Sequence, residues 1–514
     1  MPHAARNFSQ AVTSKTDQIP QWNFDKFYPD VDSPEYEADF VRLEQWAGDF
    51  KSRYEGKIVA LDGDHLAAAI EESKAMGDLQ GKLGTYVQLK QVQDSKEYTT
   101  AAEAYKNRAA PLNAAGAFFA YEIKEIEEAA LQTALKESSA LRKFRPWLDR
   151  LRKEIPHTPP LNVTQYATEM NAPGGVLALY DKWHAAKRFE FEGKELNQTE
   201  LIPIFANDPD QARRRAAHEA FINGLQQDSM LSAHLFNERL RLKGVDDKWA
   251  NFSQPWDERH LANNVTADMV DSLEKAAKDA YPRVMQRFYD LKARLIGQTH
   301  LNIYDRNVNP FETADKGAKE DKSYIPFAKA KEIVLSAYRG FSPSMADDAE
   351  KFFDNGWIDA VIGKNKRGGA FSHPGAARLA HPMVMLNYAG TPRDVATMAH
   401  ELGHGVHQVK AAHEGDAIVE SPLTFAETAS VFGEMLTFKE LVRRAGSDAE
   451  RRKLLFEKVS DMMNTVFRQI SFHDFEKRAH MAFKKENRPL TEDEIGGHFV
   501  DALQESYGSA IPLD

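Results

Sequence analysis

The sequence predicts a mostly α-helical fold, and three long stretches carry that prediction. Residues 66–89, 269–295 and 449–472 are rich in Ala, Leu, Glu and Lys, with apolar residues three and four positions apart. This spacing places the apolar side chains on one face of a helix, which can then pack on a core. The sequence shows no internal repeat and no low-complexity linker.

The composition excludes several classes of protein. The 514 residues are 42% hydrophobic, which is enough for a large buried core. Cysteine is absent, so a metal site must use His, Asp and Glu, and a cytoplasmic location is expected. The net charge of −11 is spread along the chain, which argues against nucleic acid as a partner. The apolar stretch 114–123 is too short to span a bilayer; we expect a core helix there and no membrane partner.

Two regions depart from the helical pattern, residues 297–310 and residues 361–390. Within the second, residues 363–372 have the Gly and Lys content of a tight turn between extended segments. Residues 381–388, HPMVMLNY, resemble a short buried strand. We therefore expect one small β-sheet, whose edge would receive an extended ligand. The alternative is an irregular surface loop.

A domain boundary is expected near residue 195. Residues 189–203, FEFEGKELNQTELIP, resemble a turn followed by the start of a helix. This boundary divides the chain into an N-terminal helical domain, residues 1–195, and a second domain, residues 196–514.

The clearest functional motif is His-Glu-x-x-His at residues 400–404. Thr391 is a good N-cap, Pro392 suits the first helical position, and Asp394 comes close to completing a capping box. We therefore expect a helix from about residue 392, with the motif in its interior.

The motif has the spacing of a metal site. His400 and His404 lie one helical turn apart and can reach one ion, with N–metal bonds of about 2.0–2.1 Å. Glu401 lies about 100° round the helix, where it can take a proton from a metal-bound water. The extended motif with Gly and a third His fails, because His407 and Lys410 occupy those positions. With 17 histidines, the short motif arises by chance on the order of once in twenty such chains, so a third ligand is needed.

The third ligand should be a carboxylate from a neighbouring helix. The candidates downstream are Glu414, Asp416, Glu420, Glu427 and Glu434. Glu414 and Asp416 lie in a turn-like stretch and resemble solvated loop charges. Glu427 lies early in a helix expected from Ser421-Pro422 to Gly446, among apolar residues where an unpaired carboxylate is costly. Glu434 shares its face and would orient a ligand histidine. The alternative is that both are solvated helix charges.

HELGHGVH (400–407), followed by FAETASVFGEML (425–436), resembles the zinc oligopeptidases of the oligoendopeptidase F and thimet oligopeptidase type. The similarity is greatest to oligoendopeptidase F. GKNKRGGAFSHP, MLNYAGTPRDVATMAHE and the early QWNFDKFYPDVDSPEY fit the same family. The resemblance extends from about Trp22 to the last residues and is most specific over residues 363–436.

The resemblance implies a multi-helix ellipsoid with a deep substrate channel. It implies one zinc ion per chain, held by His400, His404 and Glu427, with Glu401 as the general base. It also implies hydrolysis of internal bonds in short, unstructured peptides, since a deep channel excludes folded proteins.

The family also implies a role for two further parts of the sequence. The glycine-rich segment, through Gly368, Gly369 and Ala370, would pair with the substrate backbone. His407 matches the family motif, where it lies near the substrate; the alternative for this residue is a hydrogen-bonded helix histidine.

Two other functions remain open. The first is a zinc carboxypeptidase on a similar scaffold, which would need a basic group for the substrate C-terminus. The second is a catalytically impaired peptide-binding chain, against which the presence of Glu401 argues.

The family carries a His- and Tyr-rich segment after its zinc helices, which donates hydrogen bonds to the substrate and the oxyanion. Here PLTEDEIGGHFVDALQESYG is followed only by SAIPLD, and we do not carry the role over to His498 or Tyr507. We therefore expect this chain alone to bind zinc but to cleave peptides feebly or not at all. A missing C-terminal segment or a partner is expected to cover the channel.

Overall fold

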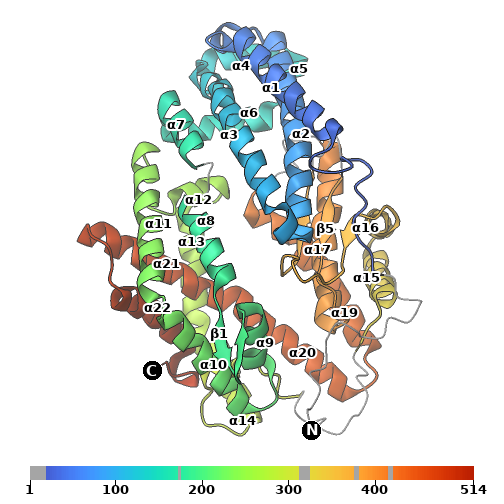
Figure 1. Ribbon diagram of the computed structural model, residues 1–514, viewed down its shortest axis with the longest axis vertical. Helices are drawn as coiled ribbons and strands as arrows, with labels where there is room; N and C mark the ends of the chain where they lie inside the picture. Colours follow the sequence, from blue (N-terminus) through green and yellow to red (C-terminus); the bar gives the residue numbers. More distant parts are fainter. Residues whose placement is uncertain (1–18, 172–174, 312–323, 376–380, 415–420, 514) are drawn as a thin grey trace. The chain divides into compact units, whose positions relative to one another are not determined.

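The structure is a computed structural model that describes residues 19–171, 175–311, 324–375, 381–414 and 421–513. Most of these residues are helical, which confirms the mostly α fold (Figure 1). The strands within them form two small sheets. Among the residues described, no helix combines the length and the apolar character needed to cross a bilayer. The ellipsoidal shape and the deep channel stay predictions.

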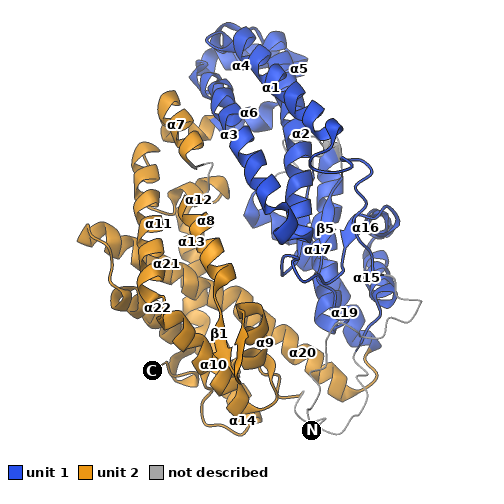
Figure 2. Ribbon diagram, in the orientation of Figure 1, with its two compact units in different colours: residues 1–151, 319–444 blue, residues 152–318, 445–514 orange. Residues whose placement is uncertain are grey.

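The chain divides into two compact units, each built from two separate stretches of sequence (Figure 2). Unit 1 comprises Met1–Leu151 and Lys319–Arg444, and unit 2 comprises Arg152–Ala318 and Ala445–Asp514. This division differs from the predicted boundary at residue 195, which lies within a strand of unit 2. The early helices and the metal-site motif therefore belong to the same unit.

Unit 1 begins with a group of helices around an aromatic core. They are α1 (Pro34–Tyr54), α2 (Gly63–Gln93), α3 (Ser95–Glu125), α4 (Glu128–Glu137), α5 (Ser139–Arg142) and α6 (Arg145–Glu154). The predicted core helix 114–123 lies in α3, where Phe118 and Ile123 are fully buried. Trp22 and Tyr86 share one apolar cluster with Met385, which lies in the strand that shortly precedes the His-Glu-x-x-His helix. The core of the first helices therefore extends to the chain next to that helix.

The later part of unit 1 contains the small sheet and the helices that flank it. Its elements are α15 (Phe327–Phe341), α16 (Pro343–Asp354), β3 (Ile358–Asp359), β4 (Phe371–His373), β5 (Met383–Met385), α17 (Pro392–Glu414) and α19 (Leu423–Arg444). The sheet has the order β3-β5-β4, with β4 at an edge. β5 pairs parallel with β3 and antiparallel with β4, where Ser372 lies opposite Val384. Both β4 and β5 pack on α17, which confirms the predicted sheet beside the motif.

Helix α17 begins as the sequence predicts. The Thr391 N–H donates to Asp394 Oδ2 at 2.9 Å, and the Asp394 N–H donates to Thr391 Oγ1 at 3.2 Å. These two bonds form the predicted capping box and satisfy backbone donors that the first turn leaves unpaired. Helix α19 packs along α17 within the same unit.

Unit 2 is also helical and holds the second sheet. Its elements are α7 (Leu161–Asn171), α8 (Gly175–Ala186), β1 (Phe189–Phe191), β2 (Lys194–Leu196), α9 (Gln198–Asn207), α10 (Gln211–Gln226), α11 (Ser229–Trp249), α12 (Asp257–Ala262), α13 (Ala267–Ala280), α14 (Arg287–Leu295), α20 (Asp448–Met463), α21 (Gln469–Glu486) and α22 (Glu492–Tyr507). A capping box between Thr491 and Glu494 starts α22, as predicted.

The hairpin of β1 and β2 was not predicted from the sequence, which indicated only a turn. Glu192 and Gly193 both have positive φ, 51° and 72°, as a two-residue hairpin turn requires. Phe189 and Phe191 are buried on one side of the hairpin, in a cluster with Leu201. Phe189 and Phe191 flank the exposed Glu190, and this alternation of apolar and polar residues is typical of a strand. It could have predicted the hairpin from the sequence.

Two of the long predicted helices contain a π-helical segment. The stretch 269–295 passes through Tyr281–Gln286, and the stretch 449–472 passes through Asn464–Arg468. In the first, Pro282 lacks the N–H that a regular helix would use, which accounts for the changed hydrogen-bond pattern.

Candidate metal centre

Three of the predicted ligands converge in unit 1. His400 Nε2 lies 3.1 Å and His404 Nε2 lies 3.5 Å from Glu427 Oε2. The two imidazole rings are almost perpendicular, with centroids 5.0 Å apart. One ligand atom from each residue lies within 4.8 Å of the others, and no second group of three with this property occurs in the described part of the chain.

Helix packing brings Glu427 to the histidines. A Cβ built on Gly403 of α17 would lie 2.6 Å from the carbonyl oxygen of Ala429, so a larger residue would push α19 away. Ser430, which is fully buried at this contact, donates from Oγ to Glu427 Oε2 at 2.8 Å. The glycine between the two histidines therefore allows the approach of α19, and Ser430 orients the carboxylate.

Glu434 lies where the sequence predicted an orienting carboxylate. Its Oε2 is 3.2 Å from His400 Nδ1, on the opposite side of the imidazole from Glu427. Burial alone would lower the pKa of His400, but the hydrogen bond to Glu434 and the charges of Glu401, Glu427 and Glu434 outweigh burial and raise it. With Nδ1 engaged by Glu434, His400 presents Nε2 as its ligand atom.

His404 has the opposite shift. Burial lowers the pKa of His404, and the neighbouring His400 adds to this effect, while the charge of Glu427 opposes it. A neutral imidazole is the form that binds a metal ion. The environment of His404 therefore favours the binding form.

Glu401 lies beside the three convergent residues and is almost completely buried, with 7% of its surface exposed. Burial raises the pKa of Glu401 to about 7, while the backbone N–H of Ser372, which faces the carboxylate, has a smaller lowering effect. A cation bound at the adjacent cluster would lower that pKa. A carboxylate with a pKa near neutral is suited to accept and return a proton.

The donor set fits a divalent metal ion. Two imidazole nitrogens and one carboxylate oxygen are the protein ligands typical of catalytic zinc sites, which keep one position open. Among the described residues, the ion-pair partners of Glu427 are His400 and His404, and no lysine or arginine neutralises it. The Glu427 side chain is 58% exposed, so the cluster is accessible to an ion and to water.

The predicted substrate-binding segment, residues 368–370, immediately precedes β4. Gly368 and Gly369 are exposed, Ala370 is half-buried, and Gly369 has a φ of 83° that favours glycine. Asn387 Nδ2 donates to the carbonyl oxygens of Arg367 and Gly369, both at 2.9 Å. The segment is therefore held in one conformation next to the edge strand.

A buried lysine anchors the start of this segment. Lys366, whose side chain is 3% exposed, donates from Nζ to Asp359 Oδ1 at 2.5 Å. The same ammonium group donates to the carbonyl oxygens of Val361 at 2.7 Å and Leu386 at 2.8 Å. These bonds tie the glycine-rich segment to the ends of β3 and β5.

The other predicted site residues have different outcomes. His407 is half-buried and close enough to His404 to influence its pKa, and its side chain makes no hydrogen bond with the described residues. Asp416 and Glu420 lie outside the described residues, as does the side chain of Glu414. The contributions of Ser372, Asn387 and Lys366 were not predicted, because their partners are distant in sequence and no local pattern marks them.

Comparisons with known proteins find oligopeptidases of similar sequence and solved structures of similar fold. Oligopeptidase PepF of Bacillus subtilis (strain 168) is 22% identical over 99% of this chain and 77% of its own length. Group B oligopeptidase PepB of Streptococcus agalactiae serotype III (strain NEM316) is 22% identical over 76% of this chain and 64% of its own length. The crystal structure of oligoendopeptidase-F from Enterococcus faecium has a TM-score of 0.66 at 17% identity, covering 93% of this chain and 81% of that chain.

The described residues combine a helical scaffold, His-Glu-x-x-His on α17 and a convergent glutamate on α19, which together form a cluster that could hold a metal ion. The model of peptidase family M3 matches residues 204–505, more than half of the chain. The chain belongs to peptidase family M3.

Proposed function

We propose that this protein is a zinc-dependent metalloendopeptidase that hydrolyses internal bonds of short, unstructured peptides. The observation that carries the proposal is the convergence of His400, His404 and Glu427 beside the buried Glu401. The preference for short peptides is supported by the relatives, whose names are oligopeptidases. The absence of cysteine supports a reducing compartment, the cytoplasm.

His400, His404 and Glu427 would hold one zinc ion, and Glu434 and Ser430 would orient two of these ligands. When bound, zinc would polarise the scissile carbonyl group and acidify a water molecule. Glu401 would accept the proton of the attacking water and deliver it to the nitrogen of the leaving amine. The free edge of β4 and Gly368–Ala370 would align the peptide backbone.

The test combines metal analysis with a series of quenched fluorescent peptides of increasing length. We expect about one zinc per chain, loss of activity with a chelator, and recovery on adding zinc. Mass spectrometry of the products should show cleavage at internal bonds. Release of single residues from the C-terminus would instead support a carboxypeptidase, and zinc-bound protein without turnover would support a peptide-binding chain.

A further inference from the structure

Two side chains of α17, seven residues apart, hold both backbone polar groups of one residue in β4. The backbone N–H of Ser372 faces the Glu401 carboxylate and acts to lower its pKa, against the larger effect of burial. Gln408 Nε2 donates to the Ser372 carbonyl oxygen at 3.3 Å, and Ser372 Oγ donates to Gln408 Oε1 at 2.8 Å. Residues seven apart share one face of a helix, so Glu401 and Gln408 both face the strand.

The edge of β4 that does not pair with β5 contacts α17 at Ser372 and would contact a ligand at the residue before the strand. In an edge strand, successive residues direct their backbone groups alternately toward the neighbouring strand and away from it. Because Ser372 faces α17, the groups of Phe371 and His373 face β5. Continued to Ala370, the residue before the strand, the same alternation directs its backbone groups to the free edge. Ala370 makes no backbone hydrogen bond with the described residues, so its N–H and C=O are available to a peptide.

We propose that Gln408 is a positioning residue, which fixes Ser372 so that its N–H holds the Glu401 carboxylate in place. An amide side chain suits this task, because it can donate to the carbonyl oxygen and accept from the hydroxyl at the same time. The role rests on the proposed peptidase function. We call the contacts of Gln408 with Ser372 the clamp. Through it, the orientation of the Glu401 carboxylate depends on the position of β4, the strand that would receive the substrate.

A second amide, from the chain that follows β5, holds the segment that precedes β4. Asn387 donates to the carbonyl oxygens of Arg367 and Gly369, just before Ala370, whereas Gln408 of α17 contacts Ser372. The two amides therefore make separable predictions. Loss of Gln408 should affect the chemical step, and loss of Asn387 should affect peptide binding.

The experiment compares Gln408→Ala, Gln408→Glu, Ser372→Ala and Asn387→Ala in the zinc-loaded full chain. Gln408→Glu keeps the acceptor for Ser372 Oγ but loses the donor to the Ser372 carbonyl oxygen. Lys410→Ala is the matched control, because Lys410 lies on the same helix and pairs with Asp348 and Ser344, away from β4. The measurements are zinc content, kcat and KM for one quenched peptide, and hydrogen exchange of the Ser372 amide.

We expect Gln408→Ala to lower kcat by about 10- to 100-fold with zinc content unchanged, as for other residues that orient a catalytic group. KM should change by less than about threefold, whereas Asn387→Ala should raise KM with a smaller change in kcat. Gln408→Glu and Ser372→Ala should fall between Gln408→Ala and the wild type. The Ser372 amide should exchange faster in Gln408→Ala and not in Lys410→Ala.

Two results would overturn the proposal. Equal exchange of the Ser372 amide in the wild type and Gln408→Ala would show that Gln408 does not hold the strand. Faster exchange with kcat within about twofold of the wild type would show that the clamp does not position Glu401. An inactive zinc-loaded wild type would instead contradict the peptidase function, and amide exchange would still decide whether Gln408 holds Ser372.

Discussion

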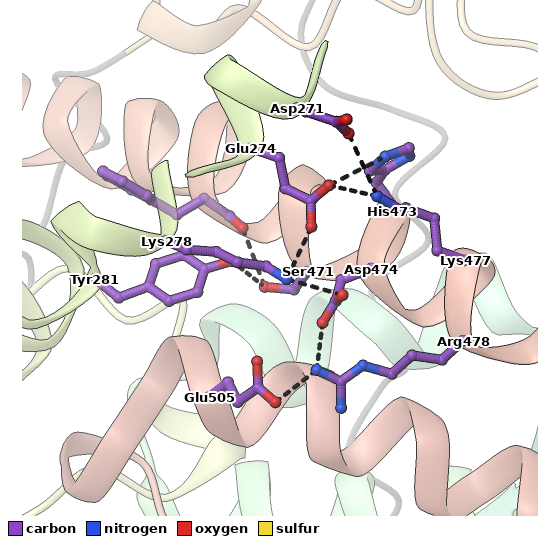
Figure 3. A network of polar contacts seen from close by, with 11 residues as sticks. Asp271, Glu274, Lys278, Tyr281, Ser471, His473, Asp474, Lys477, Arg478 and Glu505 are labelled. Atoms are coloured by element: carbon purple, nitrogen blue, oxygen red, sulfur yellow. Dashed lines mark hydrogen bonds and ion pairs between the residues drawn. The ribbon is translucent and has the colours of Figure 1, made fainter. Parts of the chain in front are cut away.

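Both units contain a histidine close to carboxylates, and the two clusters differ in what neutralises the acidic groups. In unit 2, helices α13, α21 and α22 carry a dense polar network (Figure 3). Glu274 lies 2.8 Å from the ammonium groups of both Lys278 and Lys477. Asp474 lies 2.9 Å from Lys278 and 2.6 Å from Arg478. Each of these two carboxylates therefore has two basic partners from the chain itself.

In unit 1, the carboxylate of Glu427 faces imidazoles instead. Its ion-pair partners in the described part of the chain are His400 and His404, whose Nε2 atoms both point at one oxygen. A bound cation would neutralise this carboxylate as the lysines neutralise Glu274.

The histidines show the same contrast. His473 of the unit 2 network lies 3.8 Å from Glu274, and its buried Nε2 has no hydrogen-bond partner among the described residues. His400 has a carboxylate at each ring nitrogen, at 3.1 and 3.2 Å. The comparison teaches that proximity of histidine to acidic residues does not make a metal site; the ligand atoms must converge on one point, with no basic side chain to fill it.

The largest expected effect comes from removing a converging ligand. We expect His400→Ala and Glu427→Ala to lose stoichiometric zinc and all measurable peptidase activity, because only two ligands would remain. Equilibrium dialysis followed by elemental analysis measures the bound zinc. The matched substitution in the other cluster, His473→Ala, should leave zinc binding unchanged. Zinc bound at wild-type strength by Glu427→Ala would show that the third ligand is a different residue.

The next effect concerns chemistry without metal loss. Glu401→Gln keeps the shape of the side chain but removes the proton acceptor, so we expect kcat to fall by about 10²–10⁴-fold. Zinc content should match that of the wild type. The check is kcat on one quenched peptide together with metal analysis of the same preparation. Wild-type turnover in this variant would exclude Glu401 as the base.

A smaller effect is expected from the carboxylate behind His400. Glu434→Gln removes the charge that faces Nδ1, and we expect zinc affinity to fall by about 10- to 100-fold, in line with other residues that orient metal ligands. Competition with a chromophoric chelator measures the affinity. Glu440→Gln is a suitable control, since Glu440 lies on the same helix and pairs with Arg443 and Arg444. An equal loss in both variants would point to helix stability instead.

The smallest effect should come from the unit 2 network. Burial alone would raise the pKa of Glu274, but Lys278 and Lys477 lower it from 4.5 to about 2. We expect Glu274→Gln to reduce the free energy of unfolding by about 2 kcal/mol at neutral pH, with zinc binding unchanged. Glu505→Gln, which alters a half-exposed partner of Arg478, should cost less than about 1 kcal/mol.

The pH dependence of that effect has a definite sign. Because the pKa of Glu274 is depressed in the folded state, its stabilisation is complete above about pH 4.5 and is lost as the pH falls toward 2. The difference between wild type and Glu274→Gln in denaturant unfolding should therefore shrink over this range. A constant difference across it would show that the lysines do not stabilise the ionised carboxylate.

Several features were predictable because their causes lie close together in the sequence. The spacing of apolar residues predicted the long helices, and Thr391 with Asp394 predicted the start of α17. His400 and His404 share a face because four residues make about one helical turn. The buried strand β5 followed from its apolar run. In each case, the interaction that forms the structure joins residues that are a few positions apart or that lie on one face of a single helix or strand.

What the sequence by itself determined is therefore a helix that presents two imidazoles and a neighbouring carboxylate. Only the tertiary structure decided which carboxylate joins them, because that depends on how α19 packs against Gly403. It also brought Ser372 to Glu401 and Gln408, which come from a strand and a helix with no shared local pattern. Contacts of this kind depend on the packing of whole elements, and the free energy of that packing is distributed over many side chains rather than over a readable motif.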